Sequence, residues 1–244
     1  DFESPADVYV INTCTVTNTG DSKSRQMIRK AHRTNPDAVI CVVGCYSQVA
    51  SEEITEIEGV SVVLGTQHRA SIVDFVEEYK MTHKQIVKIE NVMKVSRFED
   101  LSIHAFENKT RAFLKIQDGC NNFCTYCIIP YARGGVRSRP KEDVLRQAQE
   151  LVDRGFVEIV LTGIHTAGYG VDLDNYSFYD LLVDLTTKIK GLKRLRISSI
   201  EMSQVSDEII ELIGRSPIIV DHLHIPIQSG TDSILRRMAR HYNT

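Results

Sequence analysis

Short apolar segments alternate with amphipathic segments along this chain, and this alternation constrains the fold more than any other feature of the sequence. In the first part, the pattern predicts strands at residues 7–12, 38–43 and 60–64 and helices at residues 22–33, 51–57 and 71–78. Asp21 or Ser22 is the expected cap of the first helix. Strands joined by helices form a parallel sheet with helices packed on it. We therefore predict a small parallel α/β domain over residues 1–80.

The second part of the chain repeats the same strand–helix unit. Strands are predicted at residues 112–117, 157–161, 194–199 and 220–227, and helices at 142–154, 178–189, 207–213 and 232–240. Successive units of this kind are typical of a (β/α) barrel, although four strands are too few to close one. The expected fold class is α/β: the small parallel domain, a polar connector over residues 81–110 with room for one edge strand, and a partial barrel over residues 111–244.

Composition excludes several classes of protein. The 244 residues are 42% hydrophobic and 25% charged, as in ordinary soluble globular proteins, and the net charge of −3 gives no general affinity for nucleic acid. No apolar run approaches the roughly 20 residues of a membrane span, and no signal peptide is visible. The six cysteines are too sparse for a disulfide framework. We expect a cytoplasmic protein with reduced cysteines and no membrane partner.

Three of the cysteines stand together after the strand at 112–117, with the spacing C-x3-C-x2-C: Cys120, Cys124 and Cys127. A compact triplet of thiolates can hold a [4Fe–4S] cluster by three of its irons, and the fourth iron can then bind a small molecule. A structural zinc site needs four ligands, and the sequence offers no clear fourth, because His104 lies upstream on the far side of the strand and no cysteine follows. The triplet predicts a reactive iron–sulfur cluster, with zinc as the alternative.

Polar residues follow the other predicted barrel strands, at the edge where barrel enzymes carry their active sites. We expect these residues to surround the triplet: Thr162 and Gly163 after the second strand, Ser198 and Glu201 after the third, and Gln228 after the fourth. The first two could present backbone groups to an amino and carboxylate moiety, and the other three could bond ribose hydroxyls or adenine edges. Tyr126, inside the triplet, could stack on an adenine. The alternatives are helix caps for Ser198 and Gln228 and simple loop packing for Tyr126.

Longer strings around the cysteines carry a family resemblance. GCNNFCTYCIIPYARGGVRSRP at 119–140, INTCTVTNTGDSKSRQ at 11–26 and VVGCYSQ at 42–48 resemble the radical S-adenosylmethionine methylthiotransferases. The strings NTCTVTNTGD, RAFLKIQDGCNNFC and RISSIE are most similar to the branch that modifies N6-threonylcarbamoyladenosine in tRNA. The resemblance covers nearly the whole chain.

The resemblance implies two [4Fe–4S] clusters. Cys120, Cys124 and Cys127 would hold the radical cluster, whose open iron binds S-adenosylmethionine and yields a 5′-deoxyadenosyl radical. Cys14 and Cys45 match two of the three ligands of the family's auxiliary cluster. The third would precede Asp1, so we expect the chain to be an inactive fragment of an active enzyme. Cys41 lies inside a predicted strand and is expected to be a buried structural residue.

The implied reaction replaces the C2 hydrogen of threonylcarbamoyladenosine, next to the anticodon, with a methylthio group. The implied partners are the tRNA anticodon loop, an electron donor such as a flavodoxin or ferredoxin, and an unidentified sulfur donor. The alternative substrates are isopentenyladenosine in tRNA and an aspartate of a ribosomal protein. An alternative of another class is a non-enzymatic iron–sulfur or zinc protein with a structural or redox role.

Two groups of basic residues could bind RNA phosphates. One follows the triplet and comprises Arg133, Arg137, Arg139 and Lys141; the other lies on the first helix and comprises Lys23, Arg25, Arg29, Lys30 and Arg33. A solvated charged face is the alternative for each.

Overall fold

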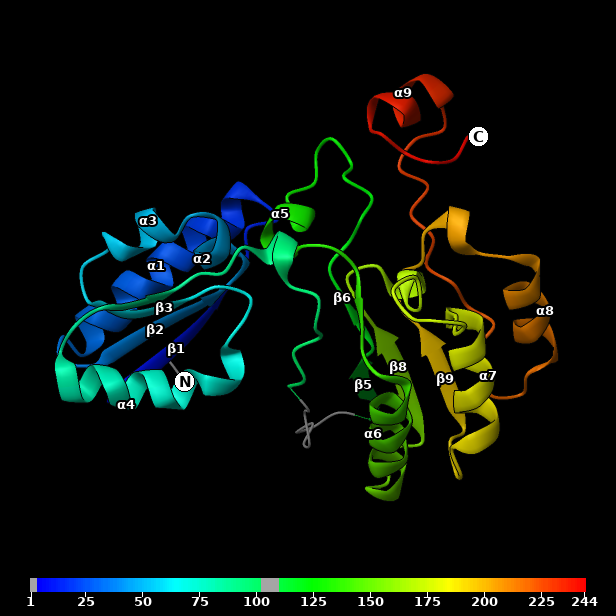
Figure 1. The fold of residues 1–244 in the computed structure, drawn as a ribbon, viewed down its shortest axis with the longest axis horizontal. Helices are drawn as coiled ribbons and strands as arrows, with labels where there is room; N and C mark the ends of the chain where they lie inside the picture. The colour runs from blue at the N-terminus through cyan, green and yellow to red at the C-terminus, as the bar shows by residue number, and fades with distance from the viewer. Residues whose placement is uncertain (1–3, 102–109) are drawn as a thin grey trace. The chain divides into compact units, whose positions relative to one another are not determined.

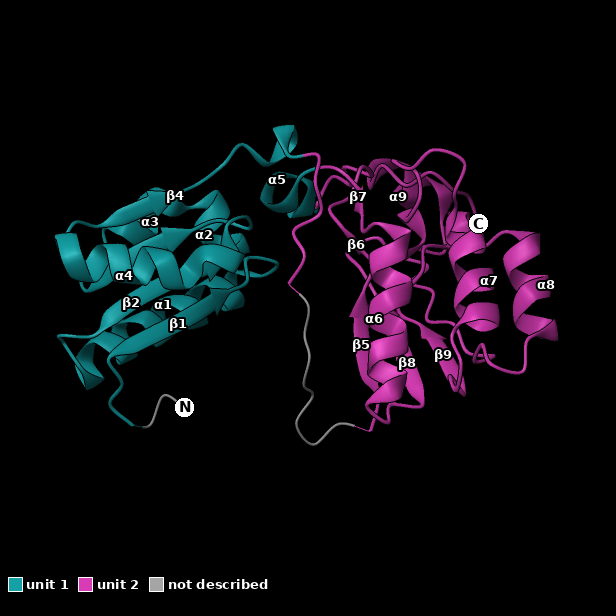
Figure 2. Cartoon of the chain, turned by 60° about the horizontal axis from the view of Figure 1, so that its bottom comes forward, with its two compact units in different colours: residues 1–95, 127–134 teal, residues 96–126, 135–244 magenta. Residues whose placement is uncertain are grey.

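The computed structural model describes residues 4–101 and 110–244, which form two compact units (Figure 2). Unit 1 comprises the residues up to Val95 together with Cys127–Gly134, and unit 2 comprises Ser96–Tyr126 and Gly135–Thr244. The units are therefore not continuous in sequence, because eight residues that follow Tyr126 pack with the N-terminal part of the chain. His104 and the rest of residues 102–109, in the predicted connector, lie outside the described residues.

Unit 1 is built on a four-stranded parallel sheet in the order β1-β2-β3-β4 (Figure 1). Its strands are β1 (Val8–Thr13), β2 (Val39–Gly44), β3 (Val60–Leu64) and β4 (Ile86–Lys88). β1 and β2 run in register to their ends, where Thr13 pairs with Gly44. The residues that follow these two strands therefore start from the same edge of the sheet.

The helices of unit 1 cover both faces of this sheet. They are α1 (Asn18–Thr34), α2 (Cys45–Val49), α3 (Ser51–Thr55), α4 (Ile72–Thr82) and α5 (Ile129–Arg133), with 3₁₀ turns η1 (Arg69–Ser71) and η2 (Val92–Lys94). The predicted cap of the first helix at Asp21 or Ser22 is wrong. Thr17 caps α1 instead, because its hydroxyl accepts a hydrogen bond from the Gly20 amide at 3.1 Å, which starts the helix one turn earlier.

Alternate side chains of β2 enter two separate cores. Ile40 and Val42 pack with residues of α1 such as Ile28, whereas Cys41 packs on the opposite face with residues such as Val76 of α4. This is the period of two that a strand imposes on its side chains. Cys41 is fully buried, and burial raises the pKa of its thiol to about 12. It is therefore a protonated core residue, in agreement with the structural role expected for it.

Unit 2 holds a three-stranded parallel sheet in the order β5-β8-β9 and a short antiparallel pair. Its strands are β5 (Ala112–Lys115), β6 (Gln117–Asp118), β7 (Arg137–Ser138), β8 (Glu158–Thr162) and β9 (Arg194–Ile197). Its helices are α6 (Lys141–Asp153), α7 (Phe178–Lys188), α8 (Asp207–Arg215) and α9 (Asp232–Arg237), with 3₁₀ turns η3 (Thr166–Gly168) and η4 (Met202–Gln204).

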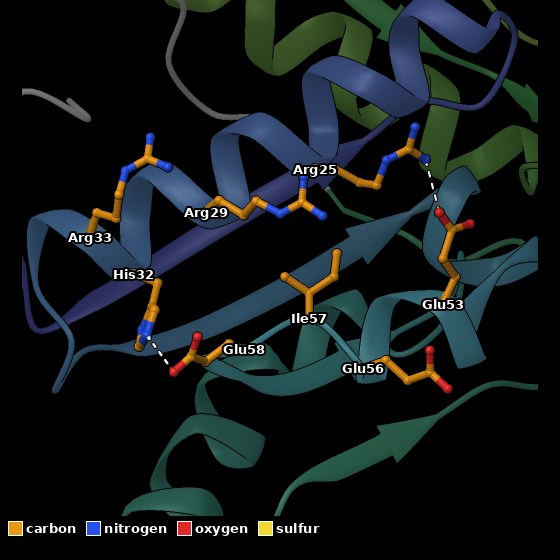
Figure 3. A pocket seen from close by; sticks show the side chains of 8 residues that line it. All are labelled: Arg25, Arg29, His32, Arg33, Glu53, Glu56, Ile57 and Glu58. Carbon is orange, nitrogen blue, oxygen red and sulfur yellow. Dashed lines mark hydrogen bonds and ion pairs between the residues drawn. The ribbon is translucent and has the colours of Figure 1, made fainter.

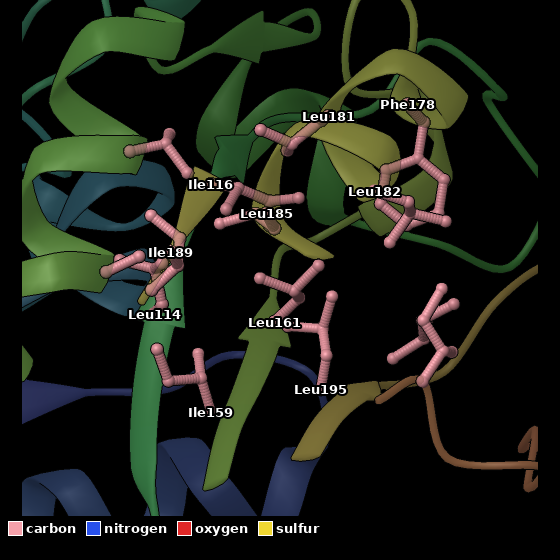
Figure 4. Close-up of a cluster of buried hydrophobic side chains, with 14 of the residues drawn as sticks. Leu114, Ile116, Ile159, Leu161, Phe178, Leu181, Leu182, Leu185, Ile189 and Leu195 are labelled. Atoms are coloured by element: carbon pink, nitrogen blue, oxygen red, sulfur yellow. The ribbon is translucent and has the colours of Figure 1, made fainter. Parts of the chain in front are cut away.

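Apolar side chains of the sheet and of α7 form the core of unit 2 (Figure 4). Leu114, Leu161 and Leu195 come from the three strands, and Leu181 and Leu185 come from α7; all five are fully buried. This core fixes the sheet edge at which the cysteine loop begins.

The predicted fourth barrel strand at 220–227 is wrong. The structure has a single isolated bridge there, between Leu195 and Ile219, and residues 220–227 form no strand. Pro226 has no amide hydrogen to donate to a ladder, which disfavours regular pairing in this segment. The α/β class is confirmed, with three parallel strands in the described part of unit 2. None of the helices in the described residues has the length and apolar character that crossing a bilayer requires.

Candidate functional site

The three clustered cysteines lie on a loop that starts at the carboxyl end of the unit 2 sheet. The buried Gln117 side chain anchors the start of this loop, because its Nε2 donates to the carbonyls of Asp118 and Gly119 at 2.7 and 2.6 Å. Its Oε1 accepts a hydrogen bond from the amide of His165 at 2.8 Å. One glutamine thereby ties the cysteine loop to the loop that follows β8.

The three cysteines of this loop do not all belong to the same compact unit. Cys120 and Cys124 are half-buried in unit 2, and Cys127 is the half-buried first residue of the segment that packs with unit 1. Within the described ranges, no three His, Cys, Asp or Glu side chains are gathered closely enough to hold one ion. The metal assignment therefore depends on the donor chemistry and the sequence spacing. Three thiolates suit an iron–sulfur cluster, whereas structural zinc would need a fourth ligand.

Two asparagines hold the middle of the loop. Asn121 accepts the Val136 amide at 3.0 Å, and Asn122 donates from Nδ2 to Oε2 of Glu201 at 2.5 Å. Nδ2 of Asn122 also lies 3.5 Å from Nε2 of His165. The loop is thereby joined to the polar residues that follow β8 and β9.

Glu201, predicted from the sequence as a site residue, is the centre of this polar group. Its Oε2 lies 3.4 Å from Nε2 of His165, and its Oε1 accepts a hydrogen bond from Arg240 at 3.1 Å. The contact with His165 does most to lower the pKa of the Glu201 carboxyl; burial opposes this effect and Arg240 adds to it. Glu201 is therefore a charged carboxylate at neutral pH, held inside the network.

Arg240 joins two further predicted site residues to Glu201. Its guanidinium donates to the hydroxyl of Tyr126 at 2.5 Å and lies 5.8 Å from the centre of that ring. The Tyr126 hydroxyl in turn donates to Oε1 of Gln228 at 3.2 Å. The structure therefore brings Tyr126, Glu201 and Gln228 together through an arginine that the strand-end pattern did not indicate, because it lies beyond α9 rather than after a strand.

The other predicted residues lie at the same sheet edge but contact neighbouring loops. The Thr162 carbonyl accepts the Ile116 amide at 2.9 Å, so it belongs to the end of the sheet ladder. A side chain at Gly163 would stand 2.9 Å from Oε1 of Gln117, so a glycine leaves room for that anchor. Oγ of Ser198 lies 2.9 Å from the hydroxyl of Thr166.

Two nitrogen atoms of the network are buried without a hydrogen-bond partner among the described residues. They are Nδ1 of His165 and Nε of Arg240. Buried polar atoms are nearly always paired, with protein, water or a ligand. The carboxylate, guanidinium, imidazole and amide groups beside the cysteine loop suit a polar ligand rather than an apolar one.

The predicted phosphate-binding role of Arg137 and Arg139 is wrong. Both side chains are only 2% exposed. Nη2 of Arg137 lies 3.9 Å from Asp118, and Nη2 of Arg139 lies 2.8 Å from Asp100. These arginines are occupied with acidic residues of unit 2 and cannot present a face to RNA.

The other two candidate cysteines follow neighbouring strands of unit 1. Cys14 is exposed and Cys45 is buried, and each comes directly after one member of the Thr13–Gly44 pair. Gly44 has a φ of 108°, and a Cβ there would stand 2.5 Å from the Thr13 carbonyl oxygen. The hydroxyl of Thr13 also donates to the Val43 carbonyl at 2.7 Å. The two cysteines therefore directly follow a pair of strand ends that are held close together.

A groove of about 510 Å³ in unit 1 has one basic and one acidic wall (Figure 3). Arginines and a histidine of α1 face glutamates that lie on and after α3; the lining residues are Arg25, Arg29, His32, Arg33, Glu53, Glu56, Ile57 and Glu58. Arg25 pairs with Glu53 at 3.0 Å, and Nε2 of His32 lies 3.8 Å from Glu58.

The groove is not an anion pocket, because its two walls offset one another. Four basic residues are on the exposed side of α1, and two of them, Arg29 and Arg33, also line the groove. There Lys23, Arg29, Lys30 and Arg33 form what we name the basic face of α1.

Comparison with protein families gives two matches that together cover most of the chain. The radical SAM superfamily matches residues 114–244, which include the cysteine loop and the polar network. The uncharacterized protein family UPF0004 matches residues 1–65, which include Cys14 and Cys45.

Curated relatives support the methylthiotransferase resemblance. A threonylcarbamoyladenosine tRNA methylthiotransferase of Bacillus subtilis is 59% identical over 242 residues, covering 99% of this chain and 54% of the relative. One of Aquifex aeolicus is 41% identical, covering 99% and 58%. A tRNA-2-methylthio-N(6)-dimethylallyladenosine synthase of Carboxydothermus hydrogenoformans is 37% identical, covering 98% and 56%. The chain spans about half the length of the curated relatives it matches.

A solved structure shares the fold. The radical S-adenosylmethionine methyltransferase TsrM from Kitasatospora setae, solved with cobalamin and a [4Fe–4S] cluster, matches with a TM-score of 0.67 at 13% identity. The match covers 99% of this chain and 54% of that one. At this identity the match supports the fold and no finer conclusion.

Proposed function

We propose that this chain, which belongs to the radical SAM superfamily, acts in the methylthiolation of N6-threonylcarbamoyladenosine in tRNA. The observation that carries the proposal is the C-x3-C-x2-C loop at the carboxyl end of a parallel sheet, ringed by the Glu201 network. The 59% identity to a threonylcarbamoyladenosine tRNA methylthiotransferase favours that substrate.

In this proposal, Cys120, Cys124 and Cys127 are the ligands of a [4Fe–4S] cluster. When bound, the cluster and S-adenosylmethionine supply the radical that activates the base. The protein binds and orients that cofactor. The polar surroundings of the cofactor are formed by Tyr126, Glu201 and Gln228. The adjoining ends of β8 and β9 are formed by Thr162, Gly163 and Ser198.

An auxiliary [4Fe–4S] cluster in unit 1 is the second part of the proposal. Cys14 and Cys45 leave adjacent parallel strands at the paired residues Thr13 and Gly44, so their backbones start side by side. Thiolates from these positions can converge on one cluster, which needs at least one further ligand. Cys41 is not proposed as that ligand, because it is fully buried within β2 among apolar residues such as Val76, and burial raises the pKa of its thiol to about 12.

The proposed partners follow from the proposed reaction. The anticodon loop of tRNA presents unpaired bases that a protein can reach, and the basic face of α1 is our candidate contact for its phosphates. A single-electron donor such as a flavodoxin or ferredoxin and a separate sulfur donor are required by the chemistry. A tRNA substrate places the protein in the cytoplasm.

Anaerobic reconstitution with iron and sulfide, followed by measurement of 5′-deoxyadenosine, tests the radical chemistry. We expect deoxyadenosine from the parent protein and none from Cys124→Ala. A protein that holds an intact cluster and forms no deoxyadenosine would instead be a structural or redox iron–sulfur protein.

Mass spectrometry of tRNA nucleosides from a strain without the gene tests the substrate. We expect loss of methylthiolated threonylcarbamoyladenosine. The second candidate is dimethylallyladenosine, favoured by the relative at 37% identity that carries that name. If only methylthiolated dimethylallyladenosine is lost and threonylcarbamoyladenosine is still methylthiolated, the substrate is dimethylallyladenosine.

A further inference from the structure

The end of α9 contacts the two residues that separate the second and third cysteines of the loop. The amide of Thr125 donates to the Met238 carbonyl at 3.3 Å, and the Thr125 hydroxyl donates to the Arg237 carbonyl at 3.1 Å. Carbonyls of the last helical turn have no partner inside their own helix. Here two of them are satisfied by a residue from far earlier in the chain.

The backbone after α9 then places Arg240 against the next loop residue. The Arg240 amide donates to the Leu235 carbonyl at 2.9 Å and the Ala239 amide to the Arg236 carbonyl at 3.1 Å, with Ala239 in the left-handed region at a φ of 54°. This is the hydrogen-bond pattern of a Schellman helix end, which turns the chain sharply. Arg240 is thereby fixed by backbone geometry.

Arg240 is held from both sides once it is placed. Its side chain is 10% exposed, with Nη1 3.1 Å from Oε1 of Glu201 and Nη2 2.5 Å from the Tyr126 hydroxyl. The planar guanidinium spans two acceptors that a flexible ammonium cannot meet in the same geometry. A solvated surface arginine would be exposed and would touch neither.

We propose that residues 237–240 form a clasp on the cysteine loop, with Arg240 as the positioning residue that sets Thr125 and Tyr126 for cluster binding. Only this dipeptide separates Cys124 from Cys127, so holding it restricts where the two sulfur atoms can point. The inference rests on the proposed function, which makes these cysteines cluster ligands. Arg240 acts through the loop and is not itself a catalytic residue.

Hydrogen–deuterium exchange on the metal-free full chain tests the clasp directly. We expect Arg240→Met to exchange residues 120–126 about tenfold faster, because two hydrogen bonds to charged groups are lost. Arg240→Lys, which can keep one partner, is expected to fall between Arg240→Met and the parent. Arg236→Met is the matched control, since Arg236 is an exposed arginine on α9, one turn before Arg240. Exchange of β5 and β8 amides, unchanged in every variant, shows that the sheet is intact.

Cluster retention provides the second measurement. After anaerobic reconstitution, iron and sulfide per chain are followed during a challenge with a chelator. Arg240→Met is expected to lose its cluster several-fold faster than the parent and Arg236→Met at the parent rate. Loop exchange and cluster loss both equal to the parent would overturn the clasp. Faster cluster loss with unchanged loop exchange would also overturn it, because Arg240 would then act on the cluster and not through the loop.

Thr125→Val keeps the test decisive if Arg240→Met does not fold. It removes the hydroxyl bond to the Arg237 carbonyl at nearly constant volume and leaves Arg240 in place. Loop exchange about threefold faster is expected, and exchange equal to the parent would contradict the clasp. None of these measurements uses tRNA or S-adenosylmethionine turnover. A failed methylthiolation assay would therefore leave them unaffected, and a failed clasp would leave the proposed reaction unaffected.

Discussion

Both units carry cysteines on loops beyond the carboxyl ends of their parallel strands, but they hold those loops by different contacts. In unit 1, Cys14 and Cys45 follow strand ends fixed by the backbone of Gly44 and by the neutral hydroxyl of Thr13. In unit 2, side chains hold the cysteine loop: the neutral amides of Gln117 and Asn122, and the charged pair Glu201 and Arg240 at the centre of the network. Close backbone approach tolerates no added atom, whereas an ion pair tolerates shape changes and depends on charge. The two sites should therefore fail under different perturbations.

Gly44→Ala should disrupt the close approach of the two strand ends in unit 1, and it should have the largest effect on stability. An added methyl would meet the Thr13 carbonyl oxygen at 2.5 Å, at a φ of 108° that favours glycine. We expect unit 1 to lose about 3 kcal/mol of unfolding free energy, measured by urea denaturation. Gly214→Ala, where nothing lies within 4 Å of the added atom, is the control. A loss below about 1 kcal/mol for Gly44→Ala would show that the strand ends can separate.

Glu201→Gln should instead weaken the charged contacts that hold the cysteine loop of unit 2. Removing the charge weakens the contacts with Arg240 and His165 while the shape is preserved, so we expect a loss of about 2 kcal/mol in the unfolding free energy of unit 2. Glu208→Gln on the exposed face of α8 is the matched control and should change little. Equal stability of Glu201→Gln and the parent would mean that shape, and not charge, holds the loop.

Substitutions on the basic face of α1 should weaken RNA binding without changing the stability of unit 1. Replacing both Arg29 and Arg33 with Gln is expected to weaken binding of an anticodon stem-loop RNA about tenfold and to reduce the salt dependence by about two phosphate contacts. Unit 1 should stay equally stable, since these exposed side chains hold neither cysteine loop. The double control Lys80→Gln and Lys84→Gln, on and after α4, should bind as the parent does. Unchanged RNA affinity in the α1 variant would place the RNA contact elsewhere.

Protonation of Glu201 at low pH should destabilise unit 2, and this is the smallest of the expected effects. The pKa of Glu201 is lowered by His165 first and by Arg240, against the effect of burial. A lowered carboxyl pKa contributes stability above the ordinary pKa of about 4.3, and this contribution is lost as the pH falls through the lowered value. Thermal melts of the parent and Glu201→Gln should therefore converge as the pH falls below about 4.3. A constant difference over that range would contradict the charge-based account of unit 2.

Much of the architecture could be predicted from local patterns. The strand at Val60–Leu64 and the helix from Phe178 are found where the periodicity placed them, because a regular apolar pattern reports which face is buried. The strand at 220–227 fails, since an apolar run alone does not show whether a partner ladder exists. The predicted phosphate-binding role of Arg137 and Arg139 fails for a related reason: the sequence shows that they are charged, but not that folding buries them beside Asp118 and Asp100.

The α/β class, the cysteine loop with its spacing and the family resemblance could all be predicted from the sequence, because they depend on residue order within short windows. The folded structure was needed to show that Tyr126, Glu201 and Gln228 meet through Arg240, and that Gly44 is required beside Thr13. Contacts between residues 126 and 240 depend on how helices and strands pack across long separations in the chain. No local pattern encodes that distance, so the polar network around the cysteines became visible only in the folded chain.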